Sequence, residues 1–139
     1  MNMAIIDAKN HVVGRLASVV AKRLLDGEDI VVVNAEKALI TGDRAMLFKE
    51  FKFRREVGST RKGPYYPRRP DRILERAIKG MVPHKRPRGR MVLKHLKVFV
   101  AVPEEYKDKK HEKIPEATHV TTARYLSLEE ISRNLGSEF

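Results

Sequence analysis

The sequence predicts a single α/β domain in which helices pack around a small, mostly parallel sheet. Short β-branched, apolar segments alternate along the chain with segments whose apolar residues recur at helical spacing, which is typical of a layered domain with its sheet inside. The length of 139 residues suits one domain and is enough to bury a core. Because we find neither an internal repeat nor a linker, we treat residues 1–139 as one unit.

Four short apolar segments are the candidate strands, at residues 4–6, 30–33, 39–41 and 98–102. The second of them, Ile-Val-Val-Val, is apolar without interruption, which is the pattern of a strand covered on both faces in a parallel sheet. A turn at residues 34–38 is expected to separate it from the third strand.

Four helices are expected, at residues 14–25, at 44–55, between Asp71 and Pro83, and after Ser127. The apolar faces of the first three consist of Leu16, Val19, Val20 and Leu24, of Leu47, Phe48 and Phe51, and of Ile73, Leu74, Ala77, Ile78 and Met81. Gly27 is the expected end of the first helix, and Asp43 and Asp71 are the expected caps of the second and third.

The last helix carries the clearest local signal. Ser127 and Glu130 form a capping box, Leu126 and Ile131 form a hydrophobic staple, and Gly136 is the stop.

Three stretches, at residues 57–69, 84–90 and 104–113, are expected to be loops, and a short helical turn is expected at 91–96. Residues 58–69 and 84–90 carry cations but no acid and no aliphatic anchor. We therefore expect both to be loose until a polyanion binds them.

The charge is strongly positive and is concentrated in the middle of the chain. The formal net charge is +11, yet residues 52–97 alone hold sixteen Lys and Arg against three acids, whereas the rest of the chain is slightly negative. Such a one-sided excess indicates a face that binds a polyanion such as nucleic acid. The chain has no cysteine, no signal peptide and no apolar run long enough to span a bilayer, so a soluble, cytoplasmic protein is expected.

Basic and aromatic residues of this middle segment are the strongest functional signal. They are Lys52, Arg54, Arg55, Arg61, Lys62, Tyr65, Tyr66, Arg68, Arg69, Arg72, His84, Lys85, Arg86, Arg88, Arg90, Lys94 and Lys97. Arginine can donate two hydrogen bonds at once to a phosphate, and tyrosine rings can stack on unpaired bases. We add Arg15, Lys37, Arg44 and Lys79 as candidate RNA-binding residues, although Lys37 and Arg44 could equally be solvated.

Catalysis, metal binding and cofactor binding are not expected. The carboxylates outside the basic segment are scattered, and each has an explanation as a turn or cap residue: Asp7, Asp26, Glu28, Asp29 and Asp43. The five histidines do not have the spacing of metal ligands. The sequence also lacks a glycine-rich nucleotide cradle, since a single Gly14 precedes the first helix.

Four paired segments resemble the universal large-subunit ribosomal protein family numbered thirteen. They are Ile-Asp-Ala at 6–8 with Gly-Arg-Leu-Ala-Ser at 14–18, Val-Val-Val-Asn-Ala-Glu-Lys at 31–37 with Thr-Gly at 41–42, Arg-Pro-Asp-Arg-Ile-Leu at 69–74 with Ala-Ile-Lys-Gly-Met-Val-Pro at 77–83, and Arg-Gly-Arg-Met at 88–91 with Leu-Lys-Val at 96–98. The last two pairs are the most specific.

The resemblance implies a three-layer α/β/α domain around a small, mostly parallel four-stranded sheet. It also implies a structural role in the large ribosomal subunit, bound to large-subunit ribosomal RNA beside neighbouring ribosomal proteins and joining early in assembly, with no membrane and no small-molecule substrate as partners. The sequence lacks the bacterial insertion between the first helix and second strand, and it departs from the bacterial pattern at 51–67 and after Glu104. It is therefore similar to the archaeal and eukaryotic branch, and its short length and high charge favour the archaeal one.

Two alternatives use the same basic segment. An RNA-modifying enzyme needs a cofactor loop or a polar catalytic cluster, and we find neither in the sequence. A DNA-binding architectural protein usually has a helix-turn-helix or a basic recognition helix. Here much of the charge lies in segments interrupted by proline and glycine, which suits irregular folded RNA better.

Overall fold

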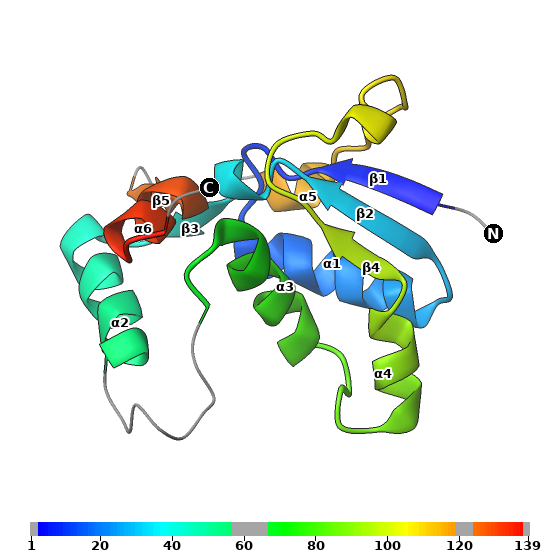
Figure 1. Cartoon of the computed structure of the whole chain (residues 1–139), viewed down its shortest axis with the longest axis horizontal. Coiled ribbons are helices and arrows are strands. Elements are labelled where there is room, and N and C mark those ends of the chain that lie inside the picture. Colours follow the sequence, from blue (N-terminus) through cyan, green and yellow to red (C-terminus); the bar gives the residue numbers. More distant parts are fainter. Residues whose placement is uncertain (1–2, 57–66, 119–123, 138–139) are drawn as a thin grey trace.

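The structure, a computed structural model, describes residues 3–56, 67–118 and 124–137 (Figure 1). In chain order the elements are β1 (Met3–Asp7), α1 (Val13–Leu25), β2 (Asp29–Val33), the 3-10 helix η1 (Ala35–Lys37), β3 (Leu39–Thr41), α2 (Arg44–Glu56), α3 (Pro70–Gly80), α4 (Pro87–Leu93), β4 (Leu96–Val98), the 3-10 helix η2 (Glu104–Tyr106), α5 (Pro115–Thr118), β5 (Tyr125–Ser127) and α6 (Leu128–Asn134). Within these ranges, no helix has both the length and the apolar character that a membrane crossing requires.

The main sheet is parallel and has the order β1-β2-β4. Ile6 lies opposite Val32, and Val32 in turn lies opposite Val98, so β2 is the central strand. The predicted α/β class and mostly parallel sheet are therefore confirmed. The expected set of four strands in one sheet is wrong, because β3 pairs antiparallel with β5 in a separate two-stranded sheet.

The alternation of side chains along β2 explains the layers. Ile30 and Val32 face the main core, which is built with α1 and α3, whereas Val31 and Val33 pack on Tyr106 at the other face. Figure 1 shows α1, α3 and α4 on one side of the main sheet and η2 on the other. The expected three layers are present. The layer on the second face of the sheet consists of the 3-10 helix η2 and the segment before it.

The predicted signals for the end of α1 and the start of α6 are confirmed. Gly27, which follows the C-cap residue Asp26 of α1, has φ +96°, a left-handed conformation that glycine adopts without strain. At α6 the Ser127 Oγ accepts a hydrogen bond from the Glu130 N–H at 3.3 Å, as in a capping box. Leu126 and Ile131 are both buried, as the staple requires.

The start of α3 differs from the prediction. Asp71 is not the cap: Arg69 occupies the cap position and Pro70 is the first helical residue. Proline suits that position because its φ is already helical and its missing N–H would have no partner there. Met81, expected in the core, lies one residue beyond the helix and is 46% exposed.

The predicted loop at 84–90 is wrong in its second half, since α4 begins at Pro87, and the strand that follows lies at 96–98 rather than 98–102. The Phe99 N–H still donates to the Val32 carbonyl at 2.8 Å, and the side chains of Phe99 and Val102 pack on the far face of the sheet beside Tyr106. Ala101, with φ +57°, interrupts the extended conformation between them.

The stretch 104–113 is largely exposed, as expected, but it is anchored. Tyr106 is buried, and the backbone of Glu112 bonds β1 twice: its N–H donates to the Ile5 carbonyl at 2.7 Å and its carbonyl accepts from the Asp7 N–H at 3.0 Å. The predicted loop at 57–69 lies mostly outside the described residues. Only residues 67–69 of it are described.

Candidate nucleic-acid interface

Most predicted RNA-binding residues lie on or next to α2, α3 and α4, and those described are exposed except for half-buried His84. We call this surface the basic face. Its members are Lys52 and Arg54 on α2, Arg68 and Arg69 before α3, Arg72 and Lys79 on α3, His84, Lys85 and Arg86 in the following turn, Arg88 and Arg90 on α4, and Lys94 and Lys97 after it. Arg61, Lys62, Tyr65 and Tyr66 lie outside the described residues, as does the side chain of Arg55.

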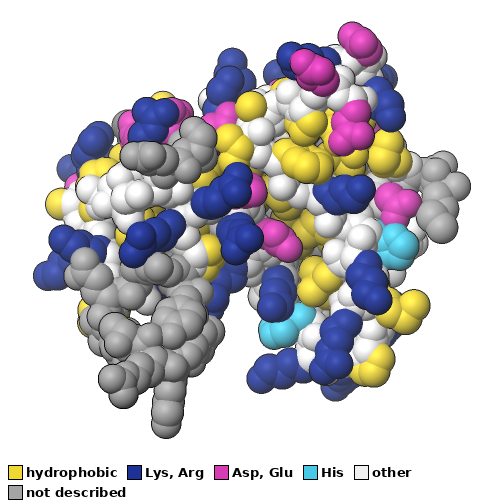
Figure 2. All heavy atoms as spheres, viewed as in Figure 1, with side chains coloured by type: hydrophobic (Ala, Val, Ile, Leu, Met, Phe, Trp, Pro, Cys, Tyr) yellow, Lys and Arg dark blue, Asp and Glu magenta, His cyan; other side chains and the backbone are white. Residues whose placement is uncertain are grey.

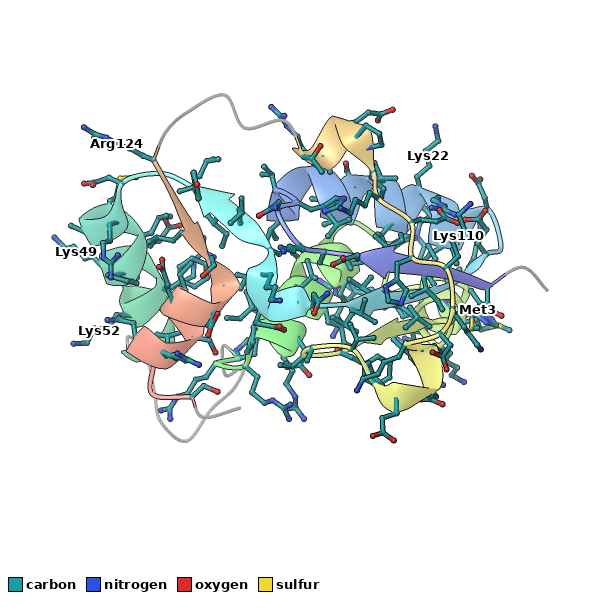
Figure 3. The ribbon with its side chains drawn as sticks, turned by 90° about the horizontal axis from the view of Figure 1, so that it is seen from above. Met3, Lys22, Lys49, Lys52, Lys110 and Arg124 are labelled. Atoms are coloured by element: carbon teal, nitrogen blue, oxygen red, sulfur yellow. The ribbon has the colours of Figure 1, made fainter. Side chains whose placement is uncertain are left out.

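Figure 2 shows how the charges are separated on the side of the molecule that it presents. Lys and Arg side chains surround α3 and α4, whereas Asp and Glu gather mainly at the upper edge, near η2. In Figure 3, Lys49 and Lys52 project outwards from α2 at one end of the molecule. A polyanion approaching α3 and α4 therefore meets mainly positive charge.

Helix α3 shows how the fold presents cations. Leu74 and Ile78 are completely buried, and α3 packs on α1 through this apolar side. Arg72, Arg76 and Lys79 lie four and three residues apart, so they share the exposed side of the helix. Arg76 was not among the predicted site residues, although its helical spacing to Arg72 was a signal that could have found it.

The turn between α3 and α4 is shaped by a close approach of two backbone segments. Gly89 is buried, and a Cβ atom placed on it would overlap the carbonyl group of Pro83. Arg90 closes the same turn, because its Nη2 donates to the Lys85 carbonyl at 3.2 Å. The structure therefore holds Lys85, Arg86, Arg88 and Arg90 together on one folded turn.

Few of these charges are neutralised within the protein. Arg54 pairs with Glu50 at 2.6 Å, and Arg69 Nε lies 3.4 Å from Asp71 Oδ1, which is buried and accepts no hydrogen bond. Across the described part of the chain, no ion pair involves Lys85, Arg86 or Arg88. Unpaired cations on a folded turn are suited to phosphate groups supplied by a partner.

Three predicted cations stand apart from α4. Lys37 lies on η1, which packs against α3 and α6 at the top of Figure 1, whereas α4 lies at the bottom, so it is not brought together with Arg88. Arg44, at the start of α2, places its guanidinium 5.1 Å from the centre of the Phe48 ring. Arg15 is exposed in the first turn of α1.

Several acidic residues outside the basic face have structural partners. Burial acts to raise the pKa of Asp7, but hydrogen bonds from Asn34 Nδ2 and the Lys9 N–H, each 3.0 Å long, outweigh it and hold that pKa below its ordinary value. Hydrogen bonding to Glu28 raises the pKa of Arg23, which also bonds Glu112 at 3.1 Å.

Asp29, the first residue of β2, pairs with His95. Among the residues that the structure describes, no group of three or more potential ligands could hold a metal ion.

The comparisons with known proteins agree with the resemblance. Residues 1–105 match the family described as Ribosomal protein L13. The chain is 51% identical to the "Large ribosomal subunit protein uL13" of Methanosarcina barkeri, over 99% of this chain and 100% of that protein. It is 50% identical to the protein of the same name from Archaeoglobus fulgidus, over 97% and 88%, and 47% identical to that from Thermoplasma volcanium, over 96% and 98%. All three organisms are archaea, as the predicted branch required.

Proposed function

The chain belongs to the ribosomal protein L13 family, and from this membership we propose that it is a structural, non-enzymatic constituent of the large ribosomal subunit. It binds large-subunit ribosomal RNA through the basic face, beside neighbouring ribosomal proteins, on ribosomes in the cytoplasm. The observation that carries RNA binding is the folded turn bearing Lys85, Arg86, Arg88 and Arg90, because three of its cations have no ion-pair partner in the described chain.

Sedimentation of a cell extract tests the place of the protein in the ribosome. We expect it to travel with the large subunit and to remain there after a moderate salt wash. Recovery mainly as free protein, or on small subunits, would contradict the proposal. If it joins early in assembly, as the resemblance implies, its depletion should cause incomplete large subunits to accumulate.

The salt dependence of RNA binding tests the basic face itself. Each phosphate contact releases counterions, so affinity should fall steeply with salt, by a log-log slope of roughly 0.7–0.9 per contact. Replacing Arg86, Arg88 and Arg90 together with alanine should flatten the slope for purified large-subunit RNA by about two units or more.

A matched variant controls for the loss of charge alone. Lys22 on α1, and Lys107 and Lys110 after η2, are also exposed and lie outside the turn that bears Arg86, Arg88 and Arg90. Replacing these three with alanine removes the same charge away from the turn and should change the slope much less. Equal effects of the two triple variants would show that net charge, and not the turn, determines binding.

A further inference from the structure

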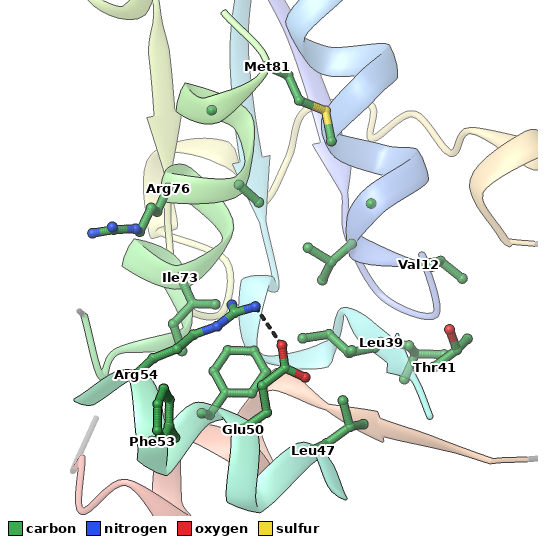
Figure 4. A pocket seen from close by; sticks show the side chains of 16 residues that line it. Val12, Leu39, Thr41, Leu47, Glu50, Phe53, Arg54, Ile73, Arg76 and Met81 are labelled. Carbon is green, nitrogen blue, oxygen red and sulfur yellow. Dashed lines mark hydrogen bonds and ion pairs between the residues drawn. The ribbon is translucent and has the colours of Figure 1, made fainter. Parts of the chain in front are cut away.

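A groove of about 990 Å³ lies between α2 and α3 and is bordered by β3 and the start of α1 (Figure 4). Its volume is at the upper end of the range of roughly 300–1,000 Å³ that ligand sites occupy. Leu39, Leu47, Phe51 and Ile73 form apolar walls. All four of these side chains are buried in the protein core. The groove is therefore a depression in packed structure.

Large apolar side chains remain exposed along this groove. Phe53 is 62% exposed and Met81 is 46% exposed, whereas Phe51, two residues before Phe53 on α2, is only 5% exposed. An aromatic ring left in water beside an apolar depression indicates a binding surface rather than a core that failed to close.

Cations border the same groove on both helices. On the α2 side the Arg54 guanidinium lies 5.3 Å from the centre of the Phe51 ring and pairs with Glu50 at 2.6 Å (Figure 4). On the α3 side Arg76 lines the groove and continues the exposed row of Arg72 and Lys79. An apolar segment of another protein would match the walls but not these charged edges.

The ligand that matches both features has a flat apolar part attached to negative charge, which describes a nucleotide. We propose that the groove receives an unpaired base of the RNA bound on the basic face, with the Phe53 ring stacked on the base and the α3 cations beside the flanking phosphates. This inference rests on the proposed function and adds a site to it, since the unpaired cations of the turn before α4 need no base.

Glu50 gives the site a preference among bases. Among the described residues that line the groove it is the only acid, and a carboxylate accepts hydrogen bonds but donates none. It therefore favours bases with an exocyclic amino group, such as adenine, over uracil.

Binding of two short probes to the full chain tests the proposal. One is an oligoadenylate, and the other is an abasic ribose phosphate chain of the same length, which carries the same charge but no bases. We expect wild type to bind the oligoadenylate more tightly, as measured by fluorescence anisotropy at low salt. Phe53→Ala should weaken oligoadenylate binding by roughly fivefold or more, because stacking contributes about 1–3 kcal/mol per base, and should leave abasic binding unchanged.

Two further variants make the result specific to the ring in the groove. Phe53→Tyr keeps an aromatic ring and should retain the preference for oligoadenylate. Met46→Ala removes another exposed apolar side chain of α2, 57% exposed and outside the groove, and should have no effect. Because residues 53 and 46 are both exposed, none of these changes should disturb folding, which urea unfolding checks.

The outcomes separate this inference from the proposed function. If wild type binds both probes equally, or if Phe53→Ala keeps the full preference, the groove does not hold a base, while RNA binding by the basic face still stands. In that case the groove suits an apolar segment of a neighbouring protein instead. If wild type binds neither probe and no ribosomal RNA, both proposals are wrong.

Discussion

Replacing Gly89 with alanine should destabilise the protein, although the same change usually stabilises a helix. Gly89 lies inside α4, and its missing side chain lets the helix approach the turn formed by residues 81–85. An added Cβ would overlap the carbonyl group of Pro83 and lie 3.0 Å from the His84 nitrogen. Since the obstacle is backbone, no side-chain rotation can relieve it, and α4 must move.

The magnitude follows from two opposing effects. Forcing extra volume into packed structure typically costs about 1–3 kcal/mol, and an overlap with backbone places Gly89→Ala at the upper end of that range. Against this, alanine is about 1 kcal/mol better than glycine inside a helix. The expected net loss of unfolding free energy is therefore about 2 kcal/mol. With an m-value of about 2 kcal/mol/M, the urea midpoint should fall by roughly 1 M.

Gly14→Ala is the matched control for this experiment. Gly14 lies in the first turn of α1, and a Cβ placed there meets no atom within 4 Å. This variant should be as stable as wild type or slightly more stable. The reasoning is refuted if Gly89→Ala unfolds at the same urea concentration as Gly14→Ala, because the close approach of α4 to the turn would then carry no constraint.

Two further predictions concern single polar groups. Because hydrogen bonds hold the pKa of Asp7 below its ordinary value of 3.8, its carboxylate should stabilise the fold at neutral pH, and this contribution should disappear as the pH falls through the lowered pKa. The difference in urea midpoint between wild type and Asp7→Asn should therefore shrink between pH 5 and about pH 2, and a constant difference would contradict this account. His11 is completely buried, with Nδ1 2.9 Å from the Lys9 carbonyl and Nε2 accepting from the Ile114 N–H at 2.9 Å. His11→Leu leaves both backbone groups without a partner and should cost about 2 kcal/mol or more, with faster hydrogen exchange at Ile114; an unchanged exchange rate would show that this bond is not stabilising.

Helical periodicity and capping chemistry predicted the parts of the fold that local sequence determines. The stripe Leu16–Val20–Leu24 placed α1 correctly, and the pair Ser127 and Glu130 placed the start of α6. The uninterrupted apolar run at 30–33 identified the central strand, because only a strand with both faces covered excludes polar residues so completely.

Tertiary contacts decided what the sequence could not show. Residues 84–90 contain proline, glycine and cations, so their local pattern predicts a loop, yet α4 forms there because Gly89 fits against Pro83. The antiparallel pair of β3 and β5 joins residues more than eighty positions apart, and the three-residue strand β5 has no pattern long enough to predict it.

The candidate site likewise has a part that the sequence could predict and a part that it could not. Charge alone located most of the basic face, since exposed cations need no packing partner to be recognised. The groove was not predicted, because it depends on how α2 and α3 lie beside β3. Helical spacing already places Phe53 off the apolar face that contains Phe51, but only the structure shows that its ring is 62% exposed beside a groove.

The C-terminal tail, the part of the chain after residue 105, positions both the basic face and the groove. The family match ends at residue 105, so the tail lies outside it, yet α6 packs on both α2 and α3. The buried Ser132 hydroxyl donates a hydrogen bond to the Arg68 carbonyl, directly before α3 and within the basic face. The tail therefore fixes the position at which the chain enters α3 and the spacing of the two helices that border the groove. It follows that changes in the tail can alter the shape of the basic face without replacing any of its residues.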